Sequence, residues 1–183
     1  MQTYRNSSLG FSISYPSSWE AVPAPWMKQF MSRAKGTSEK LAEYIAQGSQ
    51  PFLIAQNPNV PPGVAIPAVK CQAYNPASIA AAGGIDGVLS SMIRYSQQAY
   101  PDFEVNEFTP ECVMAGVVGT KMTVSMTVLN PEGNSFHGKT EMHFLPTPSF
   151  VFLVALTATS DPSLRPTEEL LQIVRSIRLG RRA

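Results

Sequence analysis

The chain has 183 residues, of which 44% are hydrophobic and only 15% are charged, and its formal net charge is +1. This length is typical of one domain and suffices for a hydrophobic core. The near-zero charge argues against a nucleic-acid partner, whose phosphates select a basic face, and the longest apolar stretch, residues 150–158, is far shorter than the roughly 20 residues of a membrane-spanning helix.

The chain begins with a strand pattern. In residues 11–15 large apolar side chains alternate with serines, which is typical of a half-buried strand. A proline-serine turn follows, after which Trp19 is expected to anchor the core and residues 20–22 to begin a second strand. Apolar residues at helical spacing predict helices at residues 25–34 and 38–45.

The middle of the chain combines short strands with a helix. Residues 51–55 predict a short strand, and the four prolines in residues 57–67 predict a loop or a sheet edge. Residues 69–74 predict the next strand. A helix is expected at residues 85–99, because apolar side chains recur along one side and Pro101 follows its end.

The remaining sequence predicts a β-meander that ends in a helix at residues 167–178. The last strand of the meander is apolar on both faces, which favours the centre of a sheet. Strands joined by short turns make that sheet mainly antiparallel, so the fold class is α+β, with one domain over residues 1–183. The strands are expected at residues 103–108, 113–128, 135–144 and 150–159, with a turn at 130–134.

Three segments resemble the PsbP-like family. Residues 10–20 read GFSISYPSSWE, similar to the strand and turn that open its members. Residues 113–119, VMAGVVG, resemble the strand that enters the family's meander. The apolar strand at 150–156 and the helix ending IVRSI at 173–177 resemble its close.

The resemblance implies an α-β-α sandwich built on an antiparallel sheet. The family includes the extrinsic oxygen-evolving subunit of photosystem II, bacterial lipoproteins, DcrB-like periplasmic proteins, a nuclear-import factor that binds the GTPase Ran, and adaptor chaperones. These members mostly bind other proteins and share no catalytic motif, so the resemblance implies a non-enzymatic protein. Residues 25–67 depart from the compact members as a helical and proline-rich insertion.

The sequence predicts neither a metal site nor a cofactor. His137 and His143 are six residues apart, which on a strand separates their backbones by roughly 20 Å, too far to share an ion. The glycine clusters at residues 83–87 and 116–121 lack the order of the nucleotide-binding motifs. No GxSxG motif marks a serine nucleophile, and Glu104, Glu107 and Glu111 are expected to face solvent.

Three sets of residues are candidates for a role beyond packing. An apolar stripe in the insertion can be core or a partner surface: Trp26, Met27, Phe30 and Met31. Polar residues of the meander can line a cleft on the sheet: Thr123, Ser125, His137 and Glu141. Cys71 and Cys112 form one disulfide in an oxidising compartment and are two free thiols in the cytosol.

Three functions follow from these candidates. The first is a non-catalytic accessory module that binds a protein or a cell-envelope component. The second is a cytoplasmic adaptor or chaperone that holds a hydrophobic client segment on the Trp26 stripe. The third is an enzyme or small-ligand binder that uses the polar cleft. No export signal precedes the first strand, so the compartment is periplasmic or extracytoplasmic if a signal has been removed and cytoplasmic otherwise; the oligomeric state stays open.

Overall fold

A computed structural model describes residues 1–22, 51–129 and 135–180. Seven of its strands form one antiparallel sheet in the order β3-β4-β5-β9-β8-β7-β6. The fourth strand of the seven is β9, so the prediction that the strand with two apolar faces occupies the sheet centre is confirmed. The strands are β3 (Glu20–Ala21), β4 (Leu53–Gln56), β5 (Ala68–Tyr74), β6 (Glu104–Met114), β7 (Val117–Leu129), β8 (Ser135–Pro146) and β9 (Val151–Thr159).

A second, three-stranded sheet joins the two ends of the chain. Strand β2 (Phe11–Tyr15) pairs with β1 (Gln2–Asn6) on one side and with β10 (Arg178–Leu179) on the other. The expected helix to residue 178 was too long, because Ile177 is buried in an extended conformation that ends the helix and turns the chain into β10.

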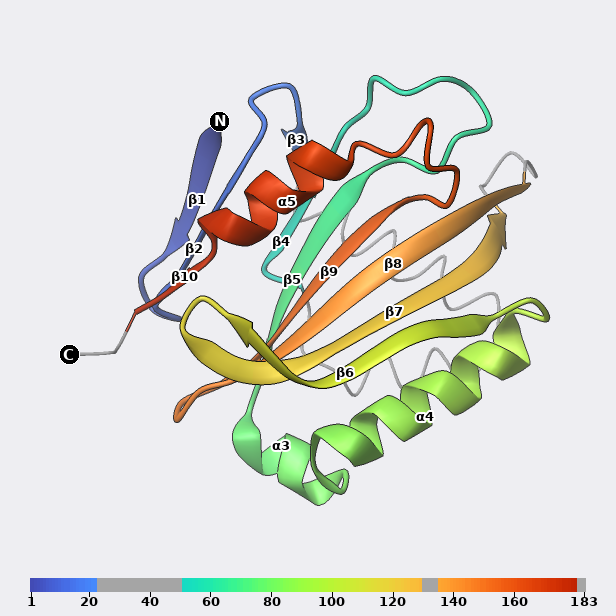
Figure 1. Cartoon of the computed structure of the whole chain (residues 1–183). Coiled ribbons are helices and arrows are strands. Elements are labelled where there is room, and N and C mark those ends of the chain that lie inside the picture. The colour runs from blue at the N-terminus through green and yellow to red at the C-terminus, as the bar shows by residue number, and fades with distance from the viewer. Residues whose placement is uncertain (23–50, 130–134, 181–183) are drawn as a thin grey trace.

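Helices complete a three-layer sandwich around the large sheet (Figure 1). Helix α5 (Thr167–Ser176) and the small sheet cover one face of its β5–β9 half. Helices α3 (Pro76–Ala81) and α4 (Gly84–Ala99) pack on the opposite face. The predicted α+β sandwich with a mainly antiparallel sheet is therefore confirmed.

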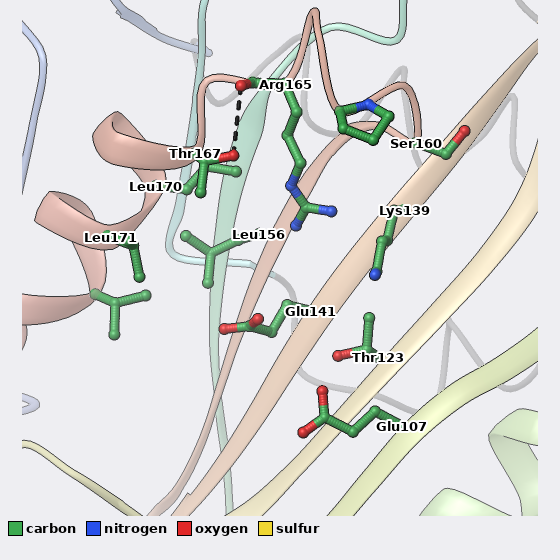
Figure 2. Close-up of a pocket in the computed structure, with 12 residues that line it drawn as sticks. Glu107, Thr123, Lys139, Glu141, Leu156, Ser160, Arg165, Thr167, Leu170 and Leu171 are labelled. Atoms are coloured by element: carbon green, nitrogen blue, oxygen red, sulfur yellow. Dashed lines mark hydrogen bonds between the residues drawn. The ribbon is translucent and has the colours of Figure 1, made fainter.

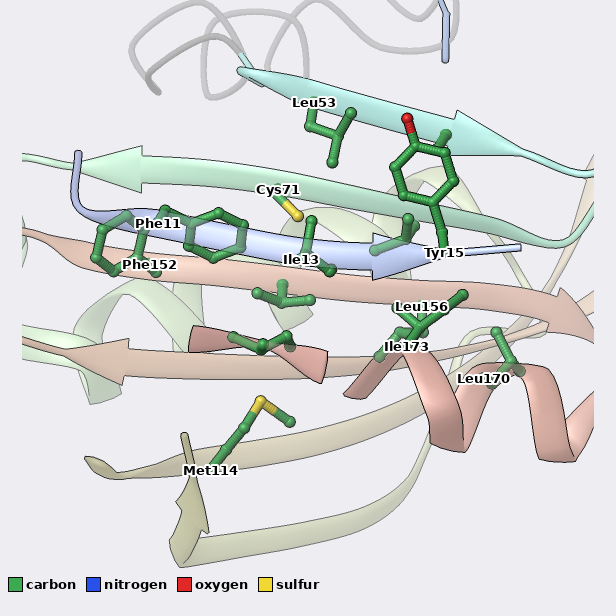
Figure 3. Packing of buried hydrophobic residues seen from close by; sticks show 14 of the residues in the cluster. Phe11, Ile13, Tyr15, Leu53, Cys71, Met114, Phe152, Leu156, Leu170 and Ile173 are labelled. Atoms are coloured by element: carbon green, nitrogen blue, oxygen red, sulfur yellow. The ribbon is translucent and has the colours of Figure 1, made fainter. Parts of the chain in front are cut away.

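The core under α5 contains the apolar positions of β2. Phe11, Ile13 and Tyr15 are buried between α5 and the large sheet, in one cluster with Phe152 of β9 and Ile173 of α5 (Figure 3). Burial of each such side chain stabilises the fold by about 1.5–3 kcal/mol, which explains why the alternation with serines specifies this strand.

Trp19 is the core anchor that its position predicted. Its side chain is 1% exposed, and its indole Nε1 donates a hydrogen bond to Oε2 of Glu169 in α5 at 3.1 Å. The hydroxyl of Ser176 adds a second link, because it accepts from the backbone N of Ser14 at 2.8 Å. The small sheet and α5 therefore form one unit.

The second core lies between α4 and the large sheet. Val88 and Leu89 of α4 pack on Met122 and Val124 of β7 and on Phe144 of β8. Met122 is fully buried here, so it fills the core. The described residues contain no helix that is long and apolar enough to cross a membrane.

The predicted strand at residues 113–128 was wrong at its start, because a tight hairpin interrupts it. Ala115 and Gly116 both have positive φ, 52° and 78°, as a primed two-residue turn between antiparallel strands requires. Strand β6 extends to this turn and is longer than predicted. Gly119 follows in β7, where a Cβ would collide with the backbone oxygen of Phe144, so glycine permits the close approach of β7 and β8.

Candidate functional site

The candidate site lies on the half of the large sheet that α5 leaves uncovered. Strands β7 and β8 pair without a bulge, and Thr123 is opposite Glu141, Ser125 opposite Lys139 and Thr127 opposite His137. Because side chains alternate along a strand, these six residues share one face. Polar residues at every second position of both strands therefore give this face its hydrophilic character.

A groove of about 340 Å³ separates this polar face from α5 and the loop before it (Figure 2). Its apolar wall consists of Leu170, Leu171 and Val174 of α5, with Leu156 of β9 between the walls. Its polar wall and rim contain Glu107, Thr123, Lys139, Glu141, Ser160 and Arg165.

Two cations point into the groove. Figure 2 shows Lys139 reaching in from β8 and Arg165 from the loop before α5. Neither forms an ion pair within the described part of the chain. The nearby carboxylates already have partners: Glu107 lies 2.6 Å from Nζ of Lys121, and Glu141 lies 2.6 Å from Nε2 of His143.

These pairs set the protonation of the two carboxylates. The hydrogen bond from Lys121 is the main cause that lowers the pKa of Glu107, and the hydrogen bond from His143 is the main cause that lowers the pKa of Glu141. Arg165 and Lys121 lower the pKa of Glu141 further by charge attraction. Both carboxylates are therefore ionised at neutral pH.

Two buried polar atoms of this region lack a hydrogen-bond partner among the described residues. They are Oγ1 of Thr123 and Nδ1 of His143, whose residues are 2% and 3% exposed. Buried polar atoms in native proteins nearly always have a partner, and an orphaned one calls for an explanation. Thr123 lines the groove, where the sheet register places it between Glu107 of β6 and Glu141 of β8.

The structure brings two of the four predicted cleft residues into the groove and keeps two outside it. Thr123 and Glu141 line it. Ser125 is buried and accepts a hydrogen bond from Nδ2 of Asn106 at 3.1 Å. His137 lies at the far end of the polar face, where Nδ1 is 3.5 Å from Oδ2 of Asp102.

Asp102 ties the loop after α4 to β7. Its carboxylate accepts hydrogen bonds from the backbone N of Thr127 at 2.9 Å and from Oγ1 of Thr127 at 2.6 Å. The hydroxyl hydrogen bond is the main cause that lowers the pKa of Asp102.

No group of three His, Cys, Asp or Glu side chains able to hold a metal ion occurs in residues 1–22, 51–129 and 135–180.

The hydroxyls at the groove's edge are bonded to backbone carbonyls. Oγ of Ser160 donates to the carbonyl oxygen of His137 at 3.1 Å, and Oγ1 of Thr167 donates to that of Arg165 at 3.5 Å. A nucleophilic hydroxyl needs a base as its hydrogen-bond partner. The partner of each of these two hydroxyls is a carbonyl oxygen and not a base.

The two cysteines do not meet. Both thiols are free: Cys71 is buried on β5, and Cys112 is partly exposed on β6. Strands β9, β8 and β7 lie between β5 and β6, which separates the thiols by about 19 Å at ~4.8 Å per strand. A disulfide needs Cα atoms within about 7 Å. The structure therefore contradicts the Cys71–Cys112 disulfide that the sequence allowed.

The other candidate set, Trp26, Met27, Phe30 and Met31, lies outside the described residues. Sequence reasoning missed the other three charged residues of the groove: Glu107, Lys139 and Arg165. Lys139 carried a usable signal, because it alternates in phase with His137 and Glu141. Arg165 lies in a loop, so no periodicity marked it.

A second hollow of about 620 Å³ lies at the opposite end of the sheet. Its walls include Leu9 of the β1–β2 turn, Val117 at the start of β7, Phe150 and Leu179 of β10. The lining is mainly apolar.

No protein-family model and no curated protein matches the sequence. Among solved structures, cyanobacterial PsbP from Synechocystis sp. PCC 6803 is 12% identical and matches 98% of this chain and 92% of its own, with a TM-score of 0.58. A Pseudomonas aeruginosa protein of unknown function is 17% identical over 71% of this chain and 82% of its own, with a TM-score of 0.50. The chain has the PsbP-like fold, as the resemblance in its sequence implied.

Proposed function

We propose that this chain is a non-catalytic accessory module that binds a protein partner through the groove between α5 and strands β6–β8. The observation that carries the proposal is the pair of cations, Lys139 and Arg165, which point into the groove without an ion-pair partner among the described residues. Charged groups that are held at a concave surface without a partner are available to a binding group from outside.

The chemistry of the groove supports binding rather than turnover. Its edge hydroxyls donate to backbone carbonyls, and the Glu141–His143 pair has no hydroxyl or thiol of the described residues as a third hydrogen-bond member. The PsbP-like fold adds to this support, because the family that the sequence resembles consists mostly of proteins that bind other proteins.

The compartment of this interaction is a separate question. A disulfide would have pointed to an oxidising compartment, but the separated thiols of Cys71 and Cys112 carry no such argument. The proposal therefore rests on the groove alone and holds for an exported or a cytoplasmic protein.

Site-specific photo-crosslinking in the source cells tests the proposal. A benzoylphenylalanine at Leu171, which is 42% exposed at the groove edge, is compared with one at Gln97, which is exposed on α4 at the opposite face. We expect a discrete protein adduct from position 171 that position 97 does not give, and we expect Lys139→Gln with Arg165→Gln to weaken it. The same adducts from both positions, or none from position 171, would overturn the proposal.

A further inference from the structure

The tip of the β6–β7 hairpin carries two exposed valines. Val113 of β6 pairs with Val118 of β7 close to the tight turn, and the two residues are 72% and 60% exposed. These are the highest values among the large apolar residues that the structure describes. Their neighbours Met114 and Val117 lie on the other face of the sheet, because side chains alternate along a strand, and Met114 is buried there. The two valines are therefore no part of the core.

The apolar surface continues on the other face of the hairpin. The hollow of about 620 Å³ brings the hairpin turn together with the β1–β2 turn and β10, and its walls include the half-buried Leu9, Phe150 and Leu179. Figure 1 shows the hairpin turn beside β10. Exposed apolar side chains that gather at one place mark an interaction site with a protein or a membrane. The charge of the same region decides between these two partners.

Arginines lie at this end of the molecule. The sheet register places Arg5 of β1 and Arg178 of β10 on either side of Ser12 of β2. The three side chains share the outer face of the small sheet, because Phe11 and Ile13 are buried on its inner face. Both arginines are exposed, and neither forms an ion pair within residues 1–22, 51–129 and 135–180.

The charge beside the hairpin is positive on balance. Arg181 and Arg182 follow Gly180 in the sequence, and Gly180 lines the hollow. The opposing carboxylate of the hairpin is that of Glu111, two residues before Val113. An anionic bilayer complements such a surface twice, because its phosphates attract arginines and its acyl region accepts apolar side chains. A nucleic acid or an acidic peptide backbone offers only the charge.

We propose that this end of the molecule binds peripherally to the surface of an anionic lipid bilayer. Val113 and Val118 enter the interface of the bilayer at the hairpin tip, and Arg5 and Arg178 lie against the headgroup phosphates. The groove between α5 and β6–β8 is at the opposite end of the sheet. The inference therefore goes beyond the proposed function and does not depend on it.

Sedimentation of the protein with lipid vesicles tests this binding. Vesicles that contain phosphatidylglycerol and phosphatidylcholine are compared with vesicles of phosphatidylcholine alone. At low salt we expect the protein to partition roughly tenfold more strongly onto the anionic vesicles. This preference should shrink as salt is added, because salt screens the attraction between arginines and phosphates. No partition onto either kind of vesicle, or equal partition onto both, overturns the inference.

The two valines separate insertion at the hairpin from general stickiness. Val113→Ser with Val118→Ser should lower the partition onto anionic vesicles roughly tenfold, because two apolar side chains no longer leave water. Ile66→Ser with Leu164→Ser is the matched control and should leave the partition unchanged. These residues are 44% and 49% exposed, in the loops before β5 and after β9 at the opposite end of the sheet. An equal loss in the control contradicts the role of the hairpin.

The arginines are tested in the same assay. Arg5→Gln should lower the partition about fivefold on anionic vesicles and leave it unchanged on phosphatidylcholine. Arg94→Gln, an exposed position on α4, is the matched control and should keep full partition. Equal partition in the two variants contradicts the contact between Arg5 and the headgroups.

A fluorescent label shows whether the hairpin itself enters the bilayer, and it requires no loss of function. Val118→Cys in a Cys112→Ser background carries an environment-sensitive fluorophore, and Ile66→Cys in the same background is the control. We expect the emission of the label at position 118 to move to shorter wavelength on anionic vesicles, whereas the label at position 66 stays unchanged. An unchanged emission at position 118 overturns the insertion of the hairpin.

Discussion

Nε2 of His143 lies 2.6 Å from Oε1 of Glu141, two positions earlier on the same face of β8. The imidazole is 3% exposed, whereas the carboxylate is at the groove. This hydrogen bond is the main cause of the lowered pKa of Glu141, and desolvation opposes it. The pair therefore connects the packed interior of the sheet to the candidate binding surface.

Replacement of Glu141 is expected to destabilise the fold. Glu141→Ala leaves Nε2 of the buried His143 without its acceptor, and a charge-assisted hydrogen bond contributes about 1.5–3 kcal/mol. Glu107→Ala on the edge strand β6 is the matched control, because it removes a carboxylate that is 53% exposed in an ion pair worth less than about 1 kcal/mol. Urea unfolding measures both, and equal losses would contradict the role of the Glu141–His143 pair.

The same carboxylate predicts how stability depends on pH. The pKa of Glu141 is lower in the folded chain than its ordinary value of 4.5, so near that pH the unfolded chain binds more protons. The stability that this group contributes is fully present above about pH 5 and is lost as the pH falls through the folded pKa. We expect the unfolding free energy to fall more steeply between about pH 5 and pH 3 in the parent chain than in Glu141→Gln. Parallel pH profiles would contradict this.

The sequence predicted those parts of the fold and site that depend on local periodicity. Strand β9 is apolar on both faces and lies at the sheet centre, and the alternation in β2 buries Phe11, Ile13 and Tyr15. Alternation in β7 and β8 likewise placed Thr123 and Glu141 on one polar face. Each of these features follows from which side of a strand a residue occupies.

Features that depend on distant parts of the chain were not predictable in this way. Strand β10 is only two residues long and exists because β2, more than 160 residues earlier, offers an edge. Arg165 reaches the groove because α5 packs across β5 and β9. The separation of Cys71 from Cys112 depends on strand order, which spacing along the chain does not reveal.

The β6–β7 hairpin predicts a stabilising substitution. Ala115 has a φ of 52°, a left-handed conformation that costs an L-residue with a Cβ roughly 1–2 kcal/mol. Ala115→Gly removes that cost but adds freedom to the unfolded chain, so a net gain of up to about 1 kcal/mol is expected. Ala115→Val, which is β-branched, should lose more than about 1 kcal/mol. Urea midpoints measure both, and a loss in Ala115→Gly would argue against this turn.

The two free thiols provide a direct test of the strand order. Burial is the main cause that raises the pKa of Cys71, and its side chain is fully buried under β2, so it should not react with a thiol reagent while the chain is folded. Cys112 is partly exposed on the edge strand β6 and should react. We expect one fast thiol in the folded protein and two in urea, with Cys112→Ser abolishing the fast one. Two fast thiols in the folded protein would contradict the packing of β5. If neither thiol reacts in urea without a reducing agent, the two cysteines form a disulfide. That result would contradict the strand order, because three strands separate Cys71 from Cys112 in this sheet.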